Sequence, residues 1–352
     1  MGIHTQAGRM IYSCLRSGIF SGAVWRIVAK GRVVSTGSVG YAERTPSTRP
    51  MRMDTIFDLA SLTKPICTGT LCLMMVESGQ ISLEEHPAEY LGELKPSWAR
   101  EITIGQLLSH SSGLPAGIPL SKMCSKPGEI LDAFSKIELA YEPGTRALYS
   151  DAGFILLGLL LESASGEGLA ALFNKRVAIC LGLKDTTFKP PLENKERIAA
   201  TEVLQPGIAL VGEVHDPNAR FMGGVSGHAG LFSTVEDLEK FCWSLLGEGE
   251  ELLSPSTVRM ATRAVSRDDG NVFGLSWFKR RSPLNPAGRM MSPAAFGHTG
   301  YTGTSIWIDP ERSAFVILLT NRVHPHDRKE TLGPMNKLRA DLHDLSVSQK
   351  DI

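Results

Sequence analysis

The first residues that could do chemistry are Ser61 and Lys64, in the segment DLASLTKPICTG at positions 58–69. Proline is tolerated in the first turn of a helix and breaks a helix deeper in. Pro65 therefore indicates that the apolar helix which follows begins close to Ser61. A spacing of three places Lys64 beside Ser61 on one helix face. A lysine shielded from water there loses affinity for its proton, and its neutral amine could accept a proton from a serine nucleophile.

This pattern is short, and a chain of this length should contain about one or two S-x-x-K copies by chance. A second copy, Ser276 and Lys279, lies in a strand-like stretch, where residues three apart point to opposite faces of a sheet. The first pair therefore needs support from elsewhere in the chain before it can be assigned to catalysis.

Two further polar segments supply that support. Tyr149 and Asp151 lie in EPGTRALYSDAGF, in a loop just before an apolar helix. His298-Thr299-Gly300 lies on a strand that we expect beside the two N-terminal strands, where glycine lets a substrate approach. Alone, each has a structural interpretation, as a loop anchor or a strand histidine. In the order S-x-x-K, Y-x-D, H-T-G they match the motif order of penicillin-interacting serine enzymes.

The surrounding elements can place these three segments together. A β hairpin with its turn at Lys30-Gly31 opens the chain, and about 190 residues of mostly helical periodicity follow. From about residue 270 short β-like segments return, before a last helix. This order predicts an α+β fold with one antiparallel sheet built from both chain ends. We predict one domain, 1–352, with an α/β lobe of residues 1–60 plus 250–352 and a mostly helical lobe of residues 61–249.

With its three motifs in this order, the sequence resembles the serine β-lactamase and D,D-peptidase superfamily, in the class C β-lactamase-like branch that includes many esterases. The segments FSGAVWRIVAKGRVV, TIGQLLSHSSGLP and GHAGLFSTVEDLEKF extend the resemblance over nearly the whole chain. It implies a β-lactamase/penicillin-binding-protein-like fold, with an inserted, mostly helical lobe.

The resemblance also implies roles for individual residues. Ser61 would be the nucleophile, and Lys64 and Tyr149 would share the proton transfers. The oxyanion hole would be the backbone N–H groups of Ser61 and Tyr301. The residues expected to bind substrate are Asp151, His298, Thr299, Gly300 and Tyr301.

Two positions depart from the commonest family pattern. Asp151 stands where the family has asparagine; an ionised carboxylate only accepts hydrogen bonds, so it would hold Lys64 charged. His298 stands where the family usually has lysine, which weakens the fixed positive charge available to a substrate carboxylate near neutral pH. We interpret His110, His228 and the glycine-rich segment 223–230 as structural, the last as a loop bordering the site.

The expected activity is that of a serine hydrolase, which cleaves an ester or amide of a small molecule through an acyl-enzyme on Ser61. The alternative is a D,D-carboxypeptidase or weak β-lactamase that acts on D-amino-acid peptides or β-lactams. A third possibility is a penicillin-binding or structural homologue without turnover. No cofactor or metal is expected, since no HExxH or comparable ligand set occurs, and the absence of G-x-S-x-G argues against an α/β-hydrolase.

Composition narrows the partners. Lys+Arg and Asp+Glu both number 37, so no charge excess suggests nucleic acid or an anionic membrane, and a small-molecule substrate is expected. The six cysteines are scattered without a C-x-x-C pair, as in a reduced protein. The first residues lack an unbroken apolar run, which favours the cytoplasm, with the periplasm as the alternative if the chain is processed. The sequence leaves the oligomeric state open.

Overall fold

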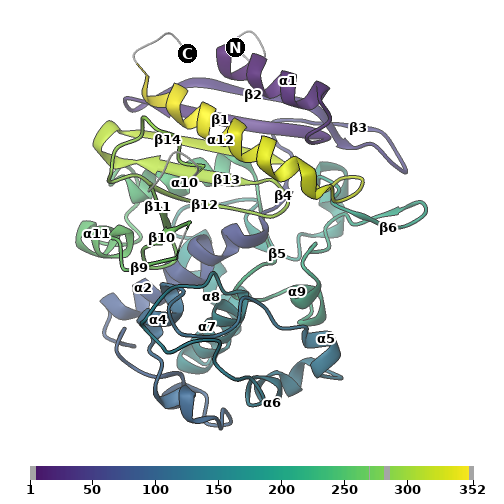
Figure 1. Ribbon diagram of the computed structural model, residues 1–352. Coiled ribbons are helices and arrows are strands. Elements are labelled where there is room, and N and C mark those ends of the chain that lie inside the picture. Colours follow the sequence, from purple (N-terminus) through teal and green to yellow (C-terminus); the bar gives the residue numbers. More distant parts are fainter. Residues whose placement is uncertain (1–4, 269, 281–285, 349–352) are drawn as a thin grey trace.

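A nine-stranded antiparallel sheet, to which both ends of the chain contribute, forms the centre of the computed structural model (Figure 1). The structure describes residues 5–268, 270–280 and 286–348. Across the sheet the strands are β3 (Arg49–Pro50), β2 (Arg32–Glu43), β1 (Gly22–Ala29), β14 (Ala314–Thr320), β13 (Ser305–Asp309), β12 (Phe296–Thr299), β11 (Phe278–Lys279), β10 (Val272–Phe273) and β9 (Ser266–Arg267). Since β1 pairs with β14, from Ala23 opposite Thr320 to Val28 opposite Phe315, the predicted pairing of the two chain ends is confirmed.

The strand that carries His298 and Thr299 is not where the sequence suggested. β12 is the third strand from β1, because β14 and β13 lie between them. The sequence of β14, AFVILLT, is apolar without alternation, and all seven residues are buried. Such a strand suits the middle of a sheet covered on both faces, and it takes the place beside β1 that we expected for the H-T-G strand.

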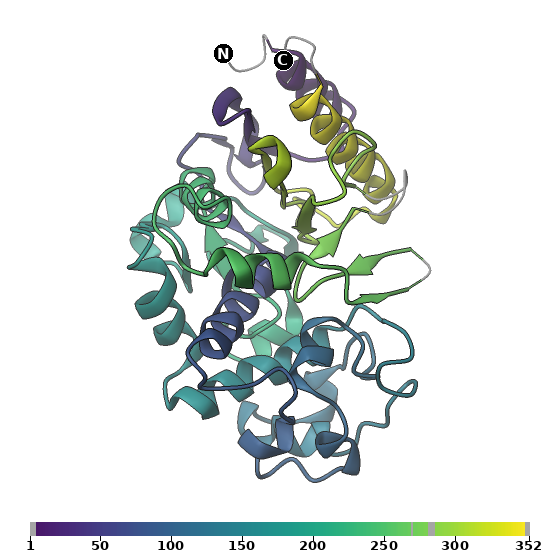
Figure 2. The same ribbon diagram turned by 90° about the vertical axis from the view of Figure 1, so that its left-hand side faces the viewer.

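Helices cover both faces of the sheet. α1 (Gln6–Arg16) and α12 (Leu332–Val347) lie over one face, and the rest of the helices lie beyond the other (Figures 1 and 2). Alternate residues of β1 divide accordingly: Trp25 packs in the α12 layer, and Val24 packs in the main core. α10 (Val235–Leu245) contacts β1 and β14 on that second face, although its residues precede the lobe boundary suggested at residue 250.

The helical part is built around α7 (Asp151–Ser165), in which nine residues are buried. Such a helix is apolar all round because other elements surround it. Its companions include α2 (Thr70–Glu77), α3 (Pro87–Tyr90), α4 (Ile104–Leu108), α5 (Leu120–Met123), α6 (Ile130–Phe134), α8 (Leu169–Phe173), α9 (Pro217–Phe221) and α11 (Pro255–Thr262). In the described part of the chain, no single helix has the length and composition to cross a membrane. Only α7 taken together with residues 169–178 has that length and composition, and these two segments are bent by 76° relative to one another.

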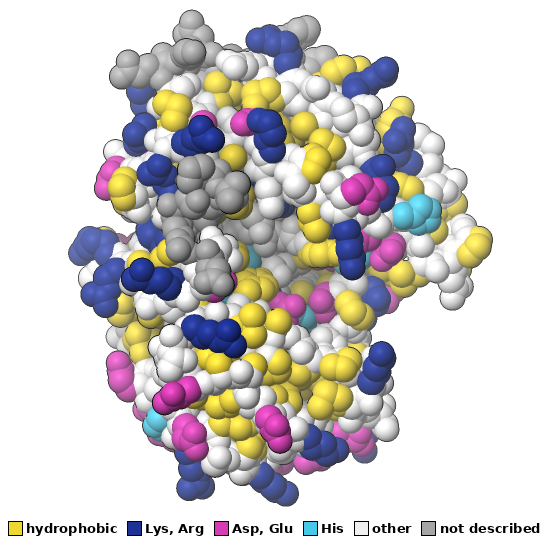
Figure 3. Space-filling model, in the orientation of Figure 1, with side chains coloured by type: hydrophobic (Ala, Val, Ile, Leu, Met, Phe, Trp, Pro, Cys, Tyr) yellow, Lys and Arg dark blue, Asp and Glu magenta, His cyan; other side chains and the backbone are white. Residues whose placement is uncertain are grey.

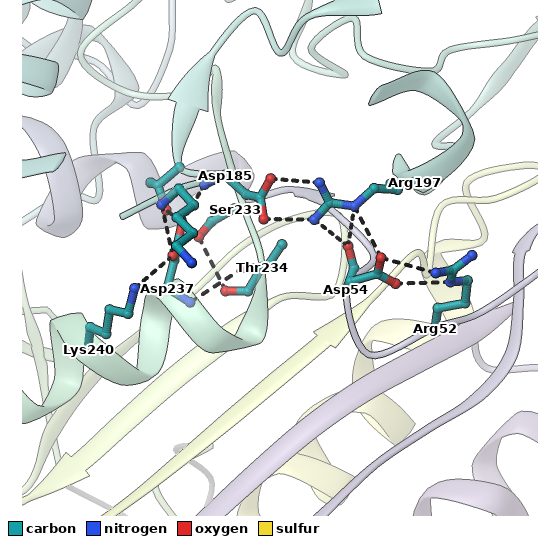
Figure 4. A network of polar contacts seen from close by, with 10 residues as sticks. Arg52, Asp54, Asp185, Arg197, Ser233, Thr234, Asp237 and Lys240 are labelled. Carbon is teal, nitrogen blue, oxygen red and sulfur yellow. Dashed lines mark hydrogen bonds and ion pairs between the residues drawn. The ribbon is translucent and has the colours of Figure 1, made fainter. Parts of the chain in front are cut away.

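A small second sheet positions the segment that leads to Ser61. β4 (Phe57–Asp58) pairs with β8 (Leu231–Ser233), and β8 pairs with β5 (Thr187–Phe188). Polar contacts surround this sheet (Figure 4). The carboxylate of Asp237 accepts hydrogen bonds from the backbone N–H groups of Lys184 and Asp185 and from the Thr186 hydroxyl. These contacts connect α10 to the strand that supports β8.

Asp237→Ala is expected to destabilise the protein by about 3 kcal/mol, because it leaves buried hydrogen-bond donors without an acceptor. Asp237 is 2% exposed, and thermal unfolding measures the loss. The matched control is Arg52→Ala, at an ion pair with Asp54 whose two side chains are 66% and 43% exposed. That change should cost less than about 1 kcal/mol. Equal losses in the two variants would contradict a structural role for Asp237.

Candidate active site

Ser61 lies in a 3-10 helix (Ala60–Leu62), which a π-helix (Lys64–Gly69) and then α2 follow. The helical stretch therefore begins beside Ser61, as Pro65 predicted, but its first turns are not α-helical. Ala60 has a φ of 48°, in the left-handed region, which costs an L-residue roughly 1–2 kcal/mol. Its N–H donates to Asp58 Oδ1 at 2.8 Å, so a buried carboxylate holds the turn that presents the serine.

The Lys64 ammonium lies among three oxygen atoms. Its Nζ is 3.0 Å from Ser61 Oγ, 2.7 Å from Asp151 Oδ1 and 3.1 Å from the carbonyl oxygen of His228. The Lys64 side chain is fully buried, and the Tyr149 hydroxyl is a further neighbour of its ammonium group.

The ion pair decides the charge of Lys64. Burial alone would lower the pKa of Lys64, but the charge of Asp151 and the contact with Tyr149 outweigh it, so this pKa is raised. Burial alone would raise the pKa of Asp151, yet the Lys64 charge lowers it overall. The raised pKa of Lys64 and the lowered pKa of Asp151 both favour an ammonium–carboxylate pair at neutral pH. This agrees with the expectation from an aspartate, in place of the family asparagine, at position 151.

Tyr149 completes the group. Its ring stacks on Phe278 with centroids 5.7 Å apart and lies 4.6 Å from the ring of His110. Its hydroxyl interacts with both Lys64 and Ser61. Burial raises the pKa of Tyr149 more than the Lys64 charge lowers it, so the resting group is a neutral phenol. Ser61 consequently has a base only after the Lys64–Tyr149 pair has lost one proton.

The loop after β12 lies directly against the nucleophile segment. The Thr302 hydroxyl donates to the Asp58 carbonyl at 2.8 Å, and the Thr304 hydroxyl donates to the Leu59 carbonyl at 3.0 Å. A Cβ atom at Gly300 would overlap the Leu59 carbonyl oxygen and the Thr304 hydroxyl. Glycine is therefore required here by the close packing of two segments that both belong to the site.

His298 is neutral in this position. It is 1% exposed, and burial, assisted by the Lys64 charge, lowers its pKa to about 3. Nδ1 lies 2.9 Å from the Thr299 carbonyl oxygen, so Nδ1 carries the proton, and Nε2 has no partner in the described part of the chain. The side chain thus supplies an acceptor where the family lysine would supply a cation.

The side chain of Tyr301 contacts neighbouring residues through both its hydroxyl and its ring. Its hydroxyl donates to Asp327 Oδ2 at 2.6 Å, and its ring stacks on His215 with centroids 6.0 Å apart. Its backbone N–H makes no hydrogen bond to another described residue, as expected for a donor reserved for an oxyanion.

Two residues that we interpreted as structural touch the site. His110 Nδ1 accepts a hydrogen bond from the Ser150 N–H at 3.0 Å and its ring contacts Tyr149. His228, besides its carbonyl contact with Lys64, lies 2.8 Å from both Asp216 Oδ1 and Ser226 Oγ. The segment 223–230 therefore borders the site as expected, but the sequence offered no signal for the contact of His228 with Asp216.

A hollow is visible between the upper and lower parts of the molecule, with acidic and histidine side chains at its edge (Figure 3). Ser61, Lys64, Tyr149, Asp151 and the β12 segment come from elements that meet at the junction of the sheet and the helical lobe. The arrangement brings together a serine, a lysine and a tyrosine in a form suited to nucleophilic attack on a carbonyl group.

Comparison with known proteins supports this chemistry. A family model described as Beta-lactamase matches residues 9–338. A putative D-alanyl-D-alanine carboxypeptidase of Escherichia coli K12 is 32% identical, over 77% of this chain and 70% of that protein. An N-acetylmuramyl-L-alanine amidase of Bacillus subtilis 168 is 33% identical, over 87% of this chain and 78% of that protein.

Solved structures show the same fold. EstCE1, a hydrolase with promiscuous acyltransferase activity, superposes with a TM-score of 0.80 at 22% identity and covers 97% of this chain and 98% of its own. A class C β-lactamase from Rhodobacter sphaeroides gives a TM-score of 0.77 at 22% identity, with the same two coverages. The predicted α+β arrangement is thereby confirmed.

Proposed function

The chain belongs to the β-lactamase family and is a serine hydrolase, and on this basis we propose that Ser61 forms the acyl-enzyme with a small ester or amide. The observation that carries the assignment is the 3.0 Å contact between Lys64 Nζ and Ser61 Oγ, beside the Tyr149 hydroxyl.

The reaction follows from these positions. Ser61 Oγ bonds to the substrate carbonyl carbon while its proton passes to the deprotonated Lys64–Tyr149 pair. The N–H groups of Ser61 and Tyr301 bind the resulting oxyanion, and each such donor is worth roughly 3 kcal/mol. The same proton then goes to the leaving amine or alcohol as its bond to carbon breaks. In the second half, a water oxygen bonds to the acyl carbon while the Lys64–Tyr149 pair takes one of its protons, and the pair returns that proton to Ser61 Oγ as the Oγ–carbon bond breaks and the acid leaves.

The substrate class has two candidates. A general small ester or amide needs only the groups described above. The names of relatives at about one-third identity favour a second candidate, an amide within a D-amino-acid peptide or a muramyl peptide. Because His298 is neutral, it supplies no positive charge that would bind a free substrate carboxylate strongly at this position. A homologue that is acylated without turnover is the third candidate.

Labelling tests the acyl-enzyme. The protein is incubated separately with a fluorescent penicillin and a fluorophosphonate, and intact mass and peptide mapping locate the adduct. We expect one adduct on Ser61 with the fluorophosphonate and none in Ser61→Ala. A mass increase with penicillin as well would favour the D-amino-acid peptide. If neither probe modifies Ser61, the proposed function is wrong. In a separate assay with a p-nitrophenyl ester, a single burst of p-nitrophenol without steady turnover would identify the third candidate.

His298→Lys is expected to change selectivity between substrates. A lysine there adds a positive charge, so kcat/KM for a peptide ending in D-Ala-D-Ala should rise at least about threefold relative to kcat/KM for p-nitrophenyl acetate. His298→Gln, which adds no charge, is the matched control and should leave this ratio unchanged. A ratio that is the same in all three proteins would show that residue 298 does not meet the substrate carboxylate.

A further inference from the structure

The loop that carries the second oxyanion donor is held from behind by two buried arginines. Arg322 donates to the Tyr301 carbonyl oxygen from Nη2 at 2.8 Å and from Nε at 3.2 Å. Its charge is balanced, because its Nη1 lies 2.9 Å from Asp327 Oδ1. Arg322 and Asp327 thus form an ordinary buried ion pair, and Arg322 fixes the position of Tyr301.

Arg339, on α12, has no such balance. Its Nη2 donates to the Thr304 carbonyl oxygen at 2.9 Å and lies 3.4 Å from the Gly300 carbonyl oxygen. Its Nη1 donates to the Asn336 amide oxygen at 2.9 Å, and its Nε has no partner among the described residues. The side chain is 4% exposed, and no carboxylate of the described chain lies within 4.0 Å of it.

An unpaired buried charge is costly, and proteins ordinarily pair or neutralise such groups. Burial, with the nearby charge of Arg322, lowers the pKa of Arg339 to about 9, so the guanidinium is still charged at neutral pH. The loop it contacts is already closed by its own hydrogen bonds, from Gly300 N–H to the Thr304 carbonyl and from Gly303 N–H to the Gly300 carbonyl. The turn therefore does not need the positive charge of Arg339 to hold its conformation.

The position of the charge relates it to the reaction. The Gly300 carbonyl and the Tyr301 N–H are the two ends of one peptide unit, so a cation near the carbonyl polarises the N–H that we assign to the oxyanion hole. The same loop reaches Leu59, two residues before Ser61, through the Thr304 hydroxyl. A positive charge behind this loop acts on a negative charge that develops in front of it.

We propose that Arg339 is a positioning residue whose unpaired charge polarises the Tyr301 end of the oxyanion hole and so stabilises the tetrahedral intermediate. The proposal rests on the proposed function, because an oxyanion forms beside the Tyr301 N–H only if Ser61 Oγ attacks the substrate carbonyl carbon. Its role is electrostatic, in contrast to that of Arg322, which is neutralised by Asp327.

Asn336 allows the charge to be cancelled without touching the arginine. Asn336→Asp places a carboxylate where the amide oxygen now accepts from Arg339 Nη1. We expect kcat/KM for p-nitrophenyl acetate to fall about tenfold, and the affinity for phenylboronic acid, which forms a tetrahedral adduct, to fall in parallel. The unfolding temperature should stay the same or rise, since an ion pair replaces a neutral contact.

Three variants control the interpretation. Asn336→Ala removes the acceptor without adding charge and should stay within about twofold of wild type. Arg339→Lys keeps the charge and should lose less than Arg339→Met, which we expect to lose at least as much as Asn336→Asp. If Arg339→Met does not fold, Asn336→Asp still decides the question.

A purely structural role for Arg339 predicts that Asn336→Asp is as active as wild type, and that result would overturn the proposal. A fall in kcat/KM with unchanged boronate affinity would overturn it too. Failure of the proposed function looks different: the wild type would then neither be labelled at Ser61 nor be inhibited by the boronate.

Discussion

Lys64→Met is expected to lower kcat/KM for a p-nitrophenyl ester by roughly 10³–10⁴-fold. Lys64 Nζ lies 3.0 Å from Ser61 Oγ, and it also forms an ion pair with Asp151. Its removal leaves the serine with Tyr149 as its sole proton acceptor, and Tyr149 is a neutral phenol whose pKa is raised by burial. Steady-state hydrolysis and the rate of fluorophosphonate labelling both measure the loss.

Lys64→Arg separates proton transfer from charge. Arginine can pair with Asp151 as lysine does, but it does not release its proton in the accessible pH range. If Lys64 takes part in proton transfer, Lys64→Arg should be nearly as inactive as Lys64→Met while retaining more of the wild-type stability. A variant Lys64→Arg with more than about one-tenth of wild-type activity would show that the lysine acts only as a fixed charge and that Tyr149 is the base.

The features that the sequence predicted correctly all depend on local rules. Pro65 limits where a helix can start, so the position of Ser61 beside a helical N-terminus followed from one residue. The hairpin at Lys30-Gly31 followed from turn chemistry, and both residues have a positive φ in the structure, 51° and 72°. The pairing of β1 with β14 followed from the β character of both chain ends.

The features that it missed depend on contacts between distant residues. Arg339 reaches Thr304 from a helix whose own pattern gives no reason for a buried cation. His228 meets Asp216 because a loop folds back, and neither residue belongs to a recognisable motif. The predicted position of the H-T-G strand in the sheet was wrong. The burial of β13 and β14, rather than the order of motifs, decides which strands are central.

Asp151 offers the sharpest test of how the site releases its first proton. In the wild type its charge raises the pKa of Lys64, so the fraction of sites with a free base is small at neutral pH and grows as the pH rises. Asparagine would remove that charge while burial, which lowers the pKa of Lys64, remains. The acidic limb of the kcat/KM profile should therefore move to lower pH in Asp151→Asn.

We expect kcat/KM of Asp151→Asn at pH 7 to rise by roughly tenfold for p-nitrophenyl acetate, with the two proteins converging at high pH, where both have lost the proton. Asp216→Asn is the matched control, since Asp216 contacts His228 and not Lys64. The acidic limb of its kcat/KM profile should move less than that of Asp151→Asn. An acidic limb that stays in place, or moves to higher pH, would mean that the protonated Lys64–Asp151 pair is the active form. In that case Lys64 would orient Ser61 as a cation, and the proton of the serine would leave through Tyr149 alone.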